Sequence, residues 1–345
     1  MRAERPLAFR ALLVRRTCLF SASVRTLTFA VLKRLAVGEF QSGEALARSL
    51  GVARASIWNA LNEARTAGVE VQRLHGRGYR LSEPLDWLDA ERIRAVFEPH
   101  GIVVNIVDSC SSTNADMLRE AEAGAASGTV LAAEWQTRGR GRLGRAWHTG
   151  LASALTFSLL WRFERPIGGL AGLSLAVGVA IARALNANGI DARLKWPNDL
   201  LWQGRKLGGI LIEVRGDALG PCATVIGVGL NVQLGREERL RIDQPAADLA
   251  EAGAARRSRS DWLIAVLHEL ALVLPTFAMH GFAAVREEWM QHHAHQNLAV
   301  RLVLPDGNLI EGEALGVDDS ACLLIATAAG TRAVHAGDVS LRVPA

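Results

Sequence analysis

Apolar positions near the start of the chain follow first a helical and then an alternating period. Residues 26–36 carry apolar side chains at helical spacing, and Gly38 ends that pattern. Ser42 can cap a second helix, and Gly51 permits a tight turn into a third helix over residues 54–67. Two short alternating segments around the turn at 75–78 then predict a hairpin. Three helices and a hairpin predict a winged helix-turn-helix over residues 26–84.

A different pattern begins beyond Pro84, which we take as a domain boundary. A short helix over 89–97 opens this part of the chain. The apolar pattern then predicts strands at 102–108, 129–136, 153–161, 192–196, 208–215 and 223–232, and helices at 114–123, 168–188, 260–279 and 283–291. Several strands follow one another without an intervening helix, which favours a mixed or antiparallel sheet. We therefore expect an α+β domain over residues 85–294, rather than a doubly wound one.

The last part of the chain has no helical periodicity. Short apolar runs predict strands at 300–304, 310–315, 322–326 and 339–343, and hence a small β-barrel over residues 295–345. The longest uncharged stretch, residues 166–182, is shorter than the roughly 20 apolar residues of a membrane span. We expect it to form a buried helix, and we expect no membrane association.

Composition indicates several folded domains in a reducing environment. With 345 residues, 50% of them hydrophobic, the chain exceeds what one core usually organises. Residues 1–34 hold eight Lys and Arg against one Glu, a net charge of +7, which leaves −3 for the rest of a chain whose total is +4. The four cysteines have no paired spacing, so we expect a cytoplasmic protein. Residues 1–25 are Arg-rich like a targeting segment, but they lack an apolar core with a cleavage site; a disordered extension or a misassigned start is expected.

The loop Gly139-Arg140-Gly141-Arg142-Leu143-Gly144-Arg145 matches the spacing of a dinucleotide-binding fingerprint. That fingerprint opens directly into a helix, whereas a strand-like segment follows here, so we reject it. Arginines that alternate with glycines can instead fold over an anion and form forked hydrogen bonds with its oxygens. For the loop taken alone, a flexible surface loop or a nucleic-acid contact is the alternative.

Other short motifs place polar side chains at the ends of predicted elements. They are Ser112-Thr113-Asn114, Gln136, Lys195-Trp196-Pro197-Asn198-Asp199, Arg205-Lys206-Leu207-Gly208-Gly209-Ile210 and Gly227-Val228-Gly229-Leu230-Asn231. Each alone has an ordinary explanation, such as a helix cap, an edge residue, a solvated lysine or close backbone packing. No Cys and His cluster has the spacing of a metal site, so no protein-held metal is predicted.

In order and spacing, these motifs together resemble the biotin protein ligase family. The match is dense over residues 112–231, and the flanking units extend it to about 27–343, as in the family's bifunctional ligase and repressor members. The resemblance implies a central class II synthetase-like mixed-sheet catalytic domain and a carboxy-terminal SH3-like β-barrel. One departure is Ser111, because the family commonly has Asp directly before Ser-Thr-Asn.

The resemblance also implies a two-step reaction that uses ATP, biotin and Mg²⁺. The carboxylate of biotin attacks the α-phosphorus of ATP to give biotinyl-5′-AMP, and a lysine of a biotin carboxyl carrier protein then attacks this adenylate. Such chemistry relies on positioning and charge stabilisation, which fits motifs rich in Arg, Lys and Asn without a side-chain nucleophile. Mg²⁺ would bridge the ATP phosphates.

The family's site residues fall on motif positions of this chain. The residues that the resemblance implies for catalysis are Arg142, Lys195 and Lys206. The implied biotin contacts are Ser112, Thr113, Asn114, Gln136, Arg140, Gly141, Arg142 and Lys206. The implied ATP contacts are Arg142, Arg145, Lys195, Asn198, Asn231 and, from the barrel, Arg342.

The amino-terminal unit is expected to bind operator DNA through its second and third helices and its hairpin. The candidate contacts are Ser42, Arg48, Arg54, Ser56, Asn59, Arg73 and Arg77. A homodimer is a further partner that the resemblance allows. Three alternatives stay open: an amino-terminal unit that only regulates or dimerises, a lipoate ligase, which shares the catalytic fold, and a transcription factor whose former enzyme domain only senses a small molecule.

Overall fold

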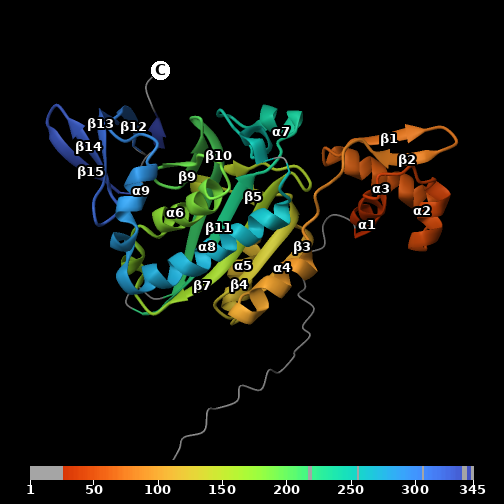
Figure 1. Ribbon diagram of the computed structural model, residues 1–345, viewed down its shortest axis with the longest axis horizontal. Coiled ribbons are helices and arrows are strands. Elements are labelled where there is room, and N and C mark those ends of the chain that lie inside the picture. The colour runs from red at the N-terminus through yellow and green to blue at the C-terminus, as the bar shows by residue number, and fades with distance from the viewer. Residues whose placement is uncertain (1–25, 217–219, 255, 305–306, 336–339, 343–345) are drawn as a thin grey trace, which may run out of the picture.

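The computed structural model describes residues 26–216, 220–254, 256–304, 307–335 and 340–342. Three units lie in a row: a small helical unit at one end, a large sheet with its helices in the middle, and a second small sheet at the other end (Figure 1). The extension predicted over residues 1–25 lies outside the described residues.

The amino-terminal unit consists of three helices and a hairpin. Its elements are α1 (Thr26–Leu35), α2 (Gly43–Leu50), α3 (Arg54–Thr66), β1 (Val71–Leu74) and β2 (Gly78–Leu81). Ser42 caps α2 through its hydroxyl, and Gly51 ends that helix at φ 65°. The hairpin is held to the start of α2, because the amides of Gln41 and Tyr79 each donate to the other's carbonyl at 2.9 and 2.8 Å. A Cβ on Gly78 would lie 2.0 Å from the Gln41 oxygen, so this close approach requires glycine.

The amino-terminal unit shares its hydrophobic core with the central unit. Leu151 and Ala152, which belong to a loop of the central unit, are buried in the same cluster as Phe29 of α1. Trp87 packs edge-on against Phe29, with ring centres 6.1 Å apart. Lys33 of α1 lies over the Trp87 ring and forms an ion pair with Asp108 of the central unit. The two units are therefore joined by apolar packing as well as by charge.

The central unit is built on a seven-stranded sheet in the order β3-β4-β7-β11-β10-β9-β8. Its strands are β3 (Val103–Cys110), β4 (Thr129–Gln136), β7 (Ala154–Phe163), β8 (Arg193–Lys195), β9 (Asp199–Trp202), β10 (Arg205–Gly216) and β11 (Cys222–Asn231). β3 and β4 are parallel, and all other neighbours in the sheet are antiparallel. The predicted mixed sheet is confirmed.

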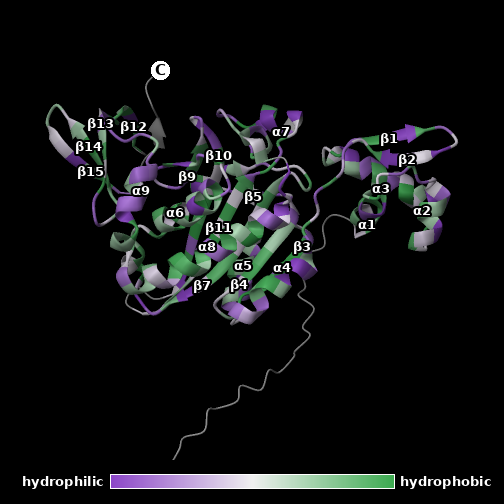
Figure 2. Ribbon diagram, viewed as in Figure 1, coloured by the Kyte–Doolittle hydropathy of each residue, from purple (hydrophilic) through white to green (hydrophobic). Residues whose placement is uncertain are grey.

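Helices cover both faces of this sheet. The helices of the central unit are α4 (Ala90–Phe97), α5 (Thr113–Glu122), α6 (Leu173–Asn186), α7 (Arg236–Arg241), α8 (Arg259–His280) and α9 (Arg286–His292). α6 and α8 pack together over one face, where they bury the main core, and α5 packs on β7 and β11 from the other side. The middle strands are coloured as hydrophobic along most of their length in Figure 2, as expected of a sheet covered on both faces.

Two helical segments, Ile167–Asn186 and Arg259–His280, are long and apolar enough to cross a membrane by length and composition. In the first, 61% of the most apolar window is buried inside the protein. The sequence predicted a buried helix in this region, and α6 forms it. The predicted start at residue 168 was early, because a 3-10 turn over Ile167–Leu170 precedes the helix.

The carboxy-terminal strands form an antiparallel five-stranded sheet in the order β15-β14-β13-β12-β16. They are β12 (Ala299–Val303), β13 (Leu309–Val317), β14 (Leu323–Thr327), β15 (Gly330–Val334) and β16 (Ser340–Arg342). The sequence pattern missed β15, because four of its five residues are exposed and show no apolar alternation. It missed α7 for a similar reason, since that six-residue helix is almost entirely charged.

A buried ion pair joins the linker to the central sheet. Arg259, at the start of α8, has no exposed surface and pairs with Glu134 of β4, which is 3% exposed. The guanidinium also donates to the carbonyls of Ala154 at 2.9 Å and Asp86 at 2.8 Å. The second oxygen of Glu134 accepts from the amide of Leu88 at 2.8 Å. One arginine and one glutamate therefore fix α8, β4, β7 and the segment that follows the amino-terminal unit.

We expect Arg259→Leu to lower the free energy of unfolding by about 3–5 kcal/mol, because it leaves Glu134 buried and unpaired. Urea unfolding of the whole chain measures this effect. The control is Arg92→Leu, which removes a half-exposed partner of Asp261 and should lower stability by about 1 kcal/mol or less. Equal losses of unfolding free energy in the two variants would show that the buried pair contributes no more to stability than the exposed one.

Candidate functional site

One face of the central sheet carries almost no side chains where β10 and β11 meet. Gly209 lies opposite Gly229, and Gly227 is on the same face because the side chains of a strand alternate. A Cβ at Gly227 would lie 2.1 Å from Asn114 Oδ1, and one at Gly229 would lie 2.5 Å from the ring of Trp147. The glycines therefore let α5 and the loop before β7 approach the sheet closely.

The amino end of α5 brings buried polar groups to this face. Ser112 precedes the helix, but its side chain does not cap it, so the ordinary explanation for a serine there does not apply. Thr113 donates to Gln136 Oε1 through its amide at 2.7 Å and through its hydroxyl at 3.2 Å. The oxygen of Gln136 is thus occupied, and its amide nitrogen is the group that it can offer to a ligand.

Asn114 anchors α5 to the sheet. Its Oδ1 accepts from Ser158 Oγ at 2.5 Å, and its Nδ2 donates to the Leu211 carbonyl at 3.2 Å and to Glu213 Oε2 at 2.9 Å. Both ends of the amide are therefore used within the protein. Sequence reasoning placed Asn114 among the biotin contacts but did not anticipate this anchoring network.

The Gly and Arg loop folds as a short hairpin. β5 (Gly139–Arg140) pairs with β6 (Ala146–Trp147), and a single 3-10 turn spans Arg142–Gly144 between them. The amide of Gly141 donates to the Arg145 carbonyl at 2.8 Å and closes the turn. Leu143, at the tip, has φ 54° and is 73% exposed. We expected only a loop over residues 139–145, because two-residue strands leave no periodic signal.

The three arginines of the loop extend to different surroundings. Arg140 pairs with Glu213 of β10 at 2.9 Å. Arg142 Nη1 donates to Asn198 Oδ1 at 3.3 Å, which joins the loop to the segment between β8 and β9. Arg145 is exposed. Arg140 and Arg142 therefore contact separate parts of the same sheet.

Lys206 and Asp199 form a largely buried ion pair of 2.7 Å, with side chains 18% and 16% exposed. The ammonium lies 5.9 Å from the centre of the Trp147 ring, and a Cβ on Gly209 would lie 3.7 Å from it. Lys195 ends β8 directly beside Asp199 of β9. The structure therefore brings the two lysines predicted as catalytic to the same end of the sheet, next to the segment that Arg142 contacts.

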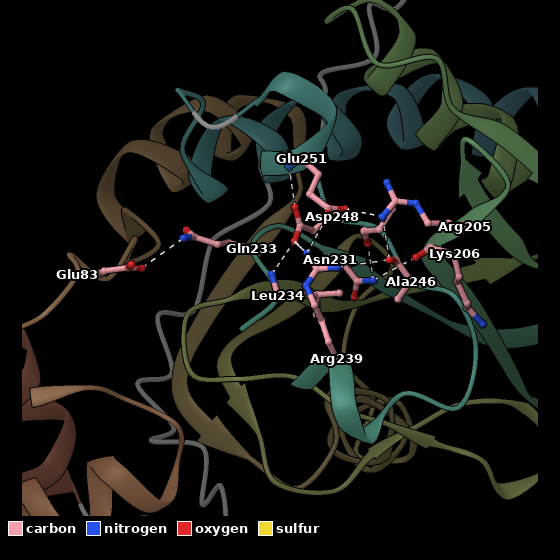
Figure 3. Close-up of polar contacts among 11 residues, drawn as sticks. Glu83, Arg205, Lys206, Asn231, Gln233, Leu234, Arg239, Ala246, Asp248 and Glu251 are labelled. Carbon is pink, nitrogen blue, oxygen red and sulfur yellow. Dashed lines mark hydrogen bonds and ion pairs between the residues drawn. The ribbon is translucent and has the colours of Figure 1, made fainter. Parts of the chain in front are cut away.

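Asn231 holds the backbone on which Lys206 is mounted (Figure 3). Its Nδ2 donates to the Lys206 carbonyl at 3.3 Å and to the Ala247 carbonyl at 2.9 Å. The amide of Ala247 donates in turn to the Lys206 carbonyl at 2.9 Å, so this segment pairs with the start of β10. Asn231, which is predicted to contact ATP, therefore also supports the protein's own backbone.

A carboxylate that sequence reasoning missed supports the same segment. Asp248 is 2% exposed and accepts from the amides of Leu234 at 2.9 Å and Glu251 at 2.8 Å (Figure 3). Arg239 of α7 pairs with it at 2.5 Å, and the guanidinium also contacts Glu251. Single charged residues in an irregular stretch carry no signal of such a network.

The Cys110 thiol and the imidazoles of His293 and His295 are uncharged at neutral pH. Burial raises the pKa of the Cys110 thiol to about 12, so this thiol stays protonated at neutral pH. Burial lowers the pKa of His293 and of His295 to about 4, and Lys195 contributes to the lower value at His295. Both imidazoles are therefore neutral. Within the described residues, no group of three His, Cys, Asp or Glu side chains could hold a metal ion.

The amino-terminal unit presents its predicted contact residues unevenly. Arg54 and Asn59 of α3 and Arg73 and Arg77 of the hairpin are exposed. Ser42 and Arg48 are exposed as well, although Ser42 caps α2 and Arg48 pairs with Glu44, whereas Ser56 is partly buried. The structure adds Trp58, which is 55% exposed on α3.

Arg342 is the last predicted ATP contact. Its backbone lies in β16 opposite Arg301, and its side chain falls outside what the structure describes.

Comparisons with known proteins match most of the chain. The biotin/lipoate A/B protein ligase family matches residues 106–231, and the biotin protein ligase C-terminal domain matches residues 297–342. The chain is 34% identical over 319 residues to the bifunctional ligase/repressor BirA of Escherichia coli (strain K12), covering 92% of this chain and 98% of that protein. It is 34% identical over 242 residues to a biotin–[acetyl-CoA-carboxylase] ligase of Mycobacterium tuberculosis, covering 68% and 88%.

A solved structure supports the same relationship. The biotin protein ligase from Aquifex aeolicus in complex with biotin and ATP superposes with a TM-score of 0.60 at 28% identity, covering 70% of this chain and 99% of that one.

We expect Gly229→Ala to weaken the binding of biotin, the ligand that the family resemblance implies, by at least tenfold. The added methyl group would displace Trp147, whose ring lies 2.5 Å from the Cβ position, and so disturb the cover of the site. Isothermal titration calorimetry measures the affinity. The control is Gly168→Ala, where a Cβ meets no atom within 4 Å. Unchanged affinity in a folded Gly229→Ala protein would contradict this location of the site.

Proposed function

Because this chain belongs to the biotin protein ligase family, we propose that it uses ATP to attach biotin to a lysine of the biotin carboxyl carrier domain of acetyl-CoA carboxylase. The observation that supports this most directly is the arrangement on the sheet: bare glycines in the middle, neutral polar groups at α5 and cations at the other end. Biotin, a bicyclic ring system with a carboxylate at the end of an aliphatic chain, fits this arrangement of neutral polar groups at one end and cations at the other.

The neutral polar end suits the ureido ring of biotin. Ser112, Thr113 and Gln136 are buried there, and together they offer hydroxyl and amide groups without a net charge. The ureido group needs both donors and acceptors, which these side chains supply. The glycine-lined middle, covered by Trp147, suits the tetrahydrothiophene ring and the aliphatic chain.

The cationic end suits the carboxylate and the phosphates. In the proposed first step, a carboxylate oxygen of biotin attacks the α-phosphorus of MgATP, the bond to the bridging oxygen breaks, and pyrophosphate leaves. Lys206, Lys195 and Arg142 would balance the negative charge that builds up on these oxygens. Mg²⁺ would arrive with the ATP phosphates as part of the substrate. Asn198, Asn231 and Arg145 are the further ATP contacts that we propose.

In the second step, the amine of the acceptor lysine attacks the acyl carbon of biotinyl-5′-AMP, an amide bond forms, and AMP leaves. No side-chain nucleophile is required, and the protonated Cys110 thiol next to α5 offers none. Incubation with biotin, MgATP and an isolated carrier domain tests the whole proposal. Lipoate in place of biotin tests the related ligase activity, and we expect no transfer of it.

We expect Lys206→Ala to lower kcat/KM for adenylate formation by about 30- to 1,000-fold, corresponding to about 2–4 kcal/mol for a lost charge-stabilising donor. Pyrophosphate release measures the rate. The control is Arg193→Ala, which removes an exposed cation of β8 that pairs with Asp191. Near-normal turnover of Lys206→Ala would assign this lysine to a structural ion pair with Asp199.

We further propose that the amino-terminal unit binds operator DNA as a dimer in the cytoplasm and represses transcription in response to biotin. The relatives named bifunctional ligase/repressor in Escherichia coli and Bacillus subtilis support this proposal. The exposed Arg54, Asn59, Arg73 and Arg77 suit phosphate and base contacts. Trp58 on the same helix suits an apolar contact with a base edge.

We expect Trp58→Ala and Arg54→Ala to weaken DNA binding in different ways. The probe is a duplex that the protein selects from a random pool, compared with a scrambled duplex across salt concentrations. Arg54→Ala should reduce the salt slope by about 1, whereas Trp58→Ala should lower the specificity ratio about tenfold with an unchanged slope. Val37→Ala, an exposed apolar residue outside α3 and the hairpin, is the control. Equal binding of all duplexes by the unaltered protein would contradict the repressor role.

A further inference from the structure

Glu213 of β10 is an acidic residue at the biotin end of the site. Its Oε2 accepts from Asn114 Nδ2 at 2.9 Å and from Arg140 Nη2 at 2.9 Å, and its Oε1 lies 3.2 Å from the same guanidinium nitrogen. The carboxylate side chain is 23% exposed, and that of Arg140 is 44% exposed. No part of the proposed reaction uses this residue.

The position of Glu213 on the sheet explains how its side chain contacts both α5 and the loop. It lies two residues beyond Leu211 and four beyond Gly209, so that its side chain projects from the ligand face of β10. Asn114 belongs to α5 above this face, and Arg140 belongs to the hairpin of the Gly and Arg loop. One carboxylate therefore connects the sheet, the helix and the loop.

We propose that Glu213 is a positioning residue that holds the Gly and Arg loop closed over the biotin end of the site by binding Arg140. The inference rests on the proposed ligase function, because it concerns the loop that covers the proposed adenylate. Asn114 fixes the carboxylate from one side, since this amide is itself held by Ser158 and Leu211. The fixed carboxylate then presents an anchor to a loop whose own backbone contacts are few.

The pairing also affects which end of the site attracts the carboxylate of biotin. A free Arg140 guanidinium beside the ureido position would attract the carboxylate of biotin to the wrong end. Because Glu213 pairs with Arg140, the charge of this guanidinium is balanced at the biotin end. Loop closure and substrate orientation thus follow from the same ion pair.

The first test measures how long the protein retains biotinyl-5′-AMP. Because the pair is partly exposed and screened by solvent, we expect Glu213→Gln to release the adenylate about three to ten times faster, rather than to abolish binding. We also expect trypsin to cleave the loop between Arg140 and Arg145 several times faster in the ligand-bound Glu213→Gln variant than in the ligand-bound unaltered protein. The matched control is Glu122→Gln, which removes an exposed partner of Arg215 that also joins α5 to β10 but does not touch the loop.

The second test changes Arg140, the residue that the loop contributes to the pair. Arg140→Gln should accelerate release to a similar extent, and combining it with Glu213→Gln should add little, because both changes remove one contact. The exchanged pair, Arg140→Glu with Glu213→Arg, should restore at least part of the retention and protease resistance. Thermal unfolding midpoints report any general loss of structure in these variants.

Several outcomes would overturn this inference. Release and cleavage at the control rate in a folded Glu213→Gln protein would show that the carboxylate does not hold the loop. Fully additive effects of the two single changes would show that the residues act separately. A failure of the unaltered protein to form any adenylate is distinguishable, because it would overturn the proposed ligase function itself.

Discussion

The buried pair between Arg259 and Glu134 is the interaction on which the arrangement of the central unit depends. An arginine without exposed surface requires partners for its charge, since burying an unpaired ion is strongly unfavourable. Arg259 finds them on β4, on β7 and on the linker at Asp86. The packing of α8 and the exit of the chain from the amino-terminal unit are thereby fixed by the same side chain.

This constraint is close to the site. Glu134 lies two residues before Gln136 on β4; Glu134 contacts α8, and Gln136 contacts the start of α5. The pair therefore sets the position of the strand end that receives Thr113 and from which the Gly and Arg loop departs. Toward the other end of the sheet, Asn231 and Asp248 act in a comparable way on the backbone that carries Lys206. Rigid supports of this kind are what charge-stabilising chemistry requires.

Much of this organisation could be predicted from the sequence, because the elements that carry it are periodic. The apolar pattern identified six of the seven strands of the mixed sheet, all but β9, and the linear motifs identified the segments that meet over Gly209 and Gly229. What could not be predicted are contacts between residues far apart in the chain. Arg140 and Glu213 are 73 positions apart, and the sequence around each residue does not indicate that it contacts the other. β5, β6, α7 and β15 were missed because they are too short or too polar to show a period.

The shared core of the amino-terminal and central units has a consequence for shortened forms of this protein. Leu151 and Ala152 are buried against residues of α1 and α3, and Trp135 packs at the edge of the same cluster. A chain that begins after residue 84 would present these side chains to water as a contiguous apolar surface. Such a protein would tend to self-associate for reasons unrelated to its chemistry. A soluble version would require polar replacements at positions 151 and 152, whereas relatives that lack an amino-terminal unit should already carry polar residues there.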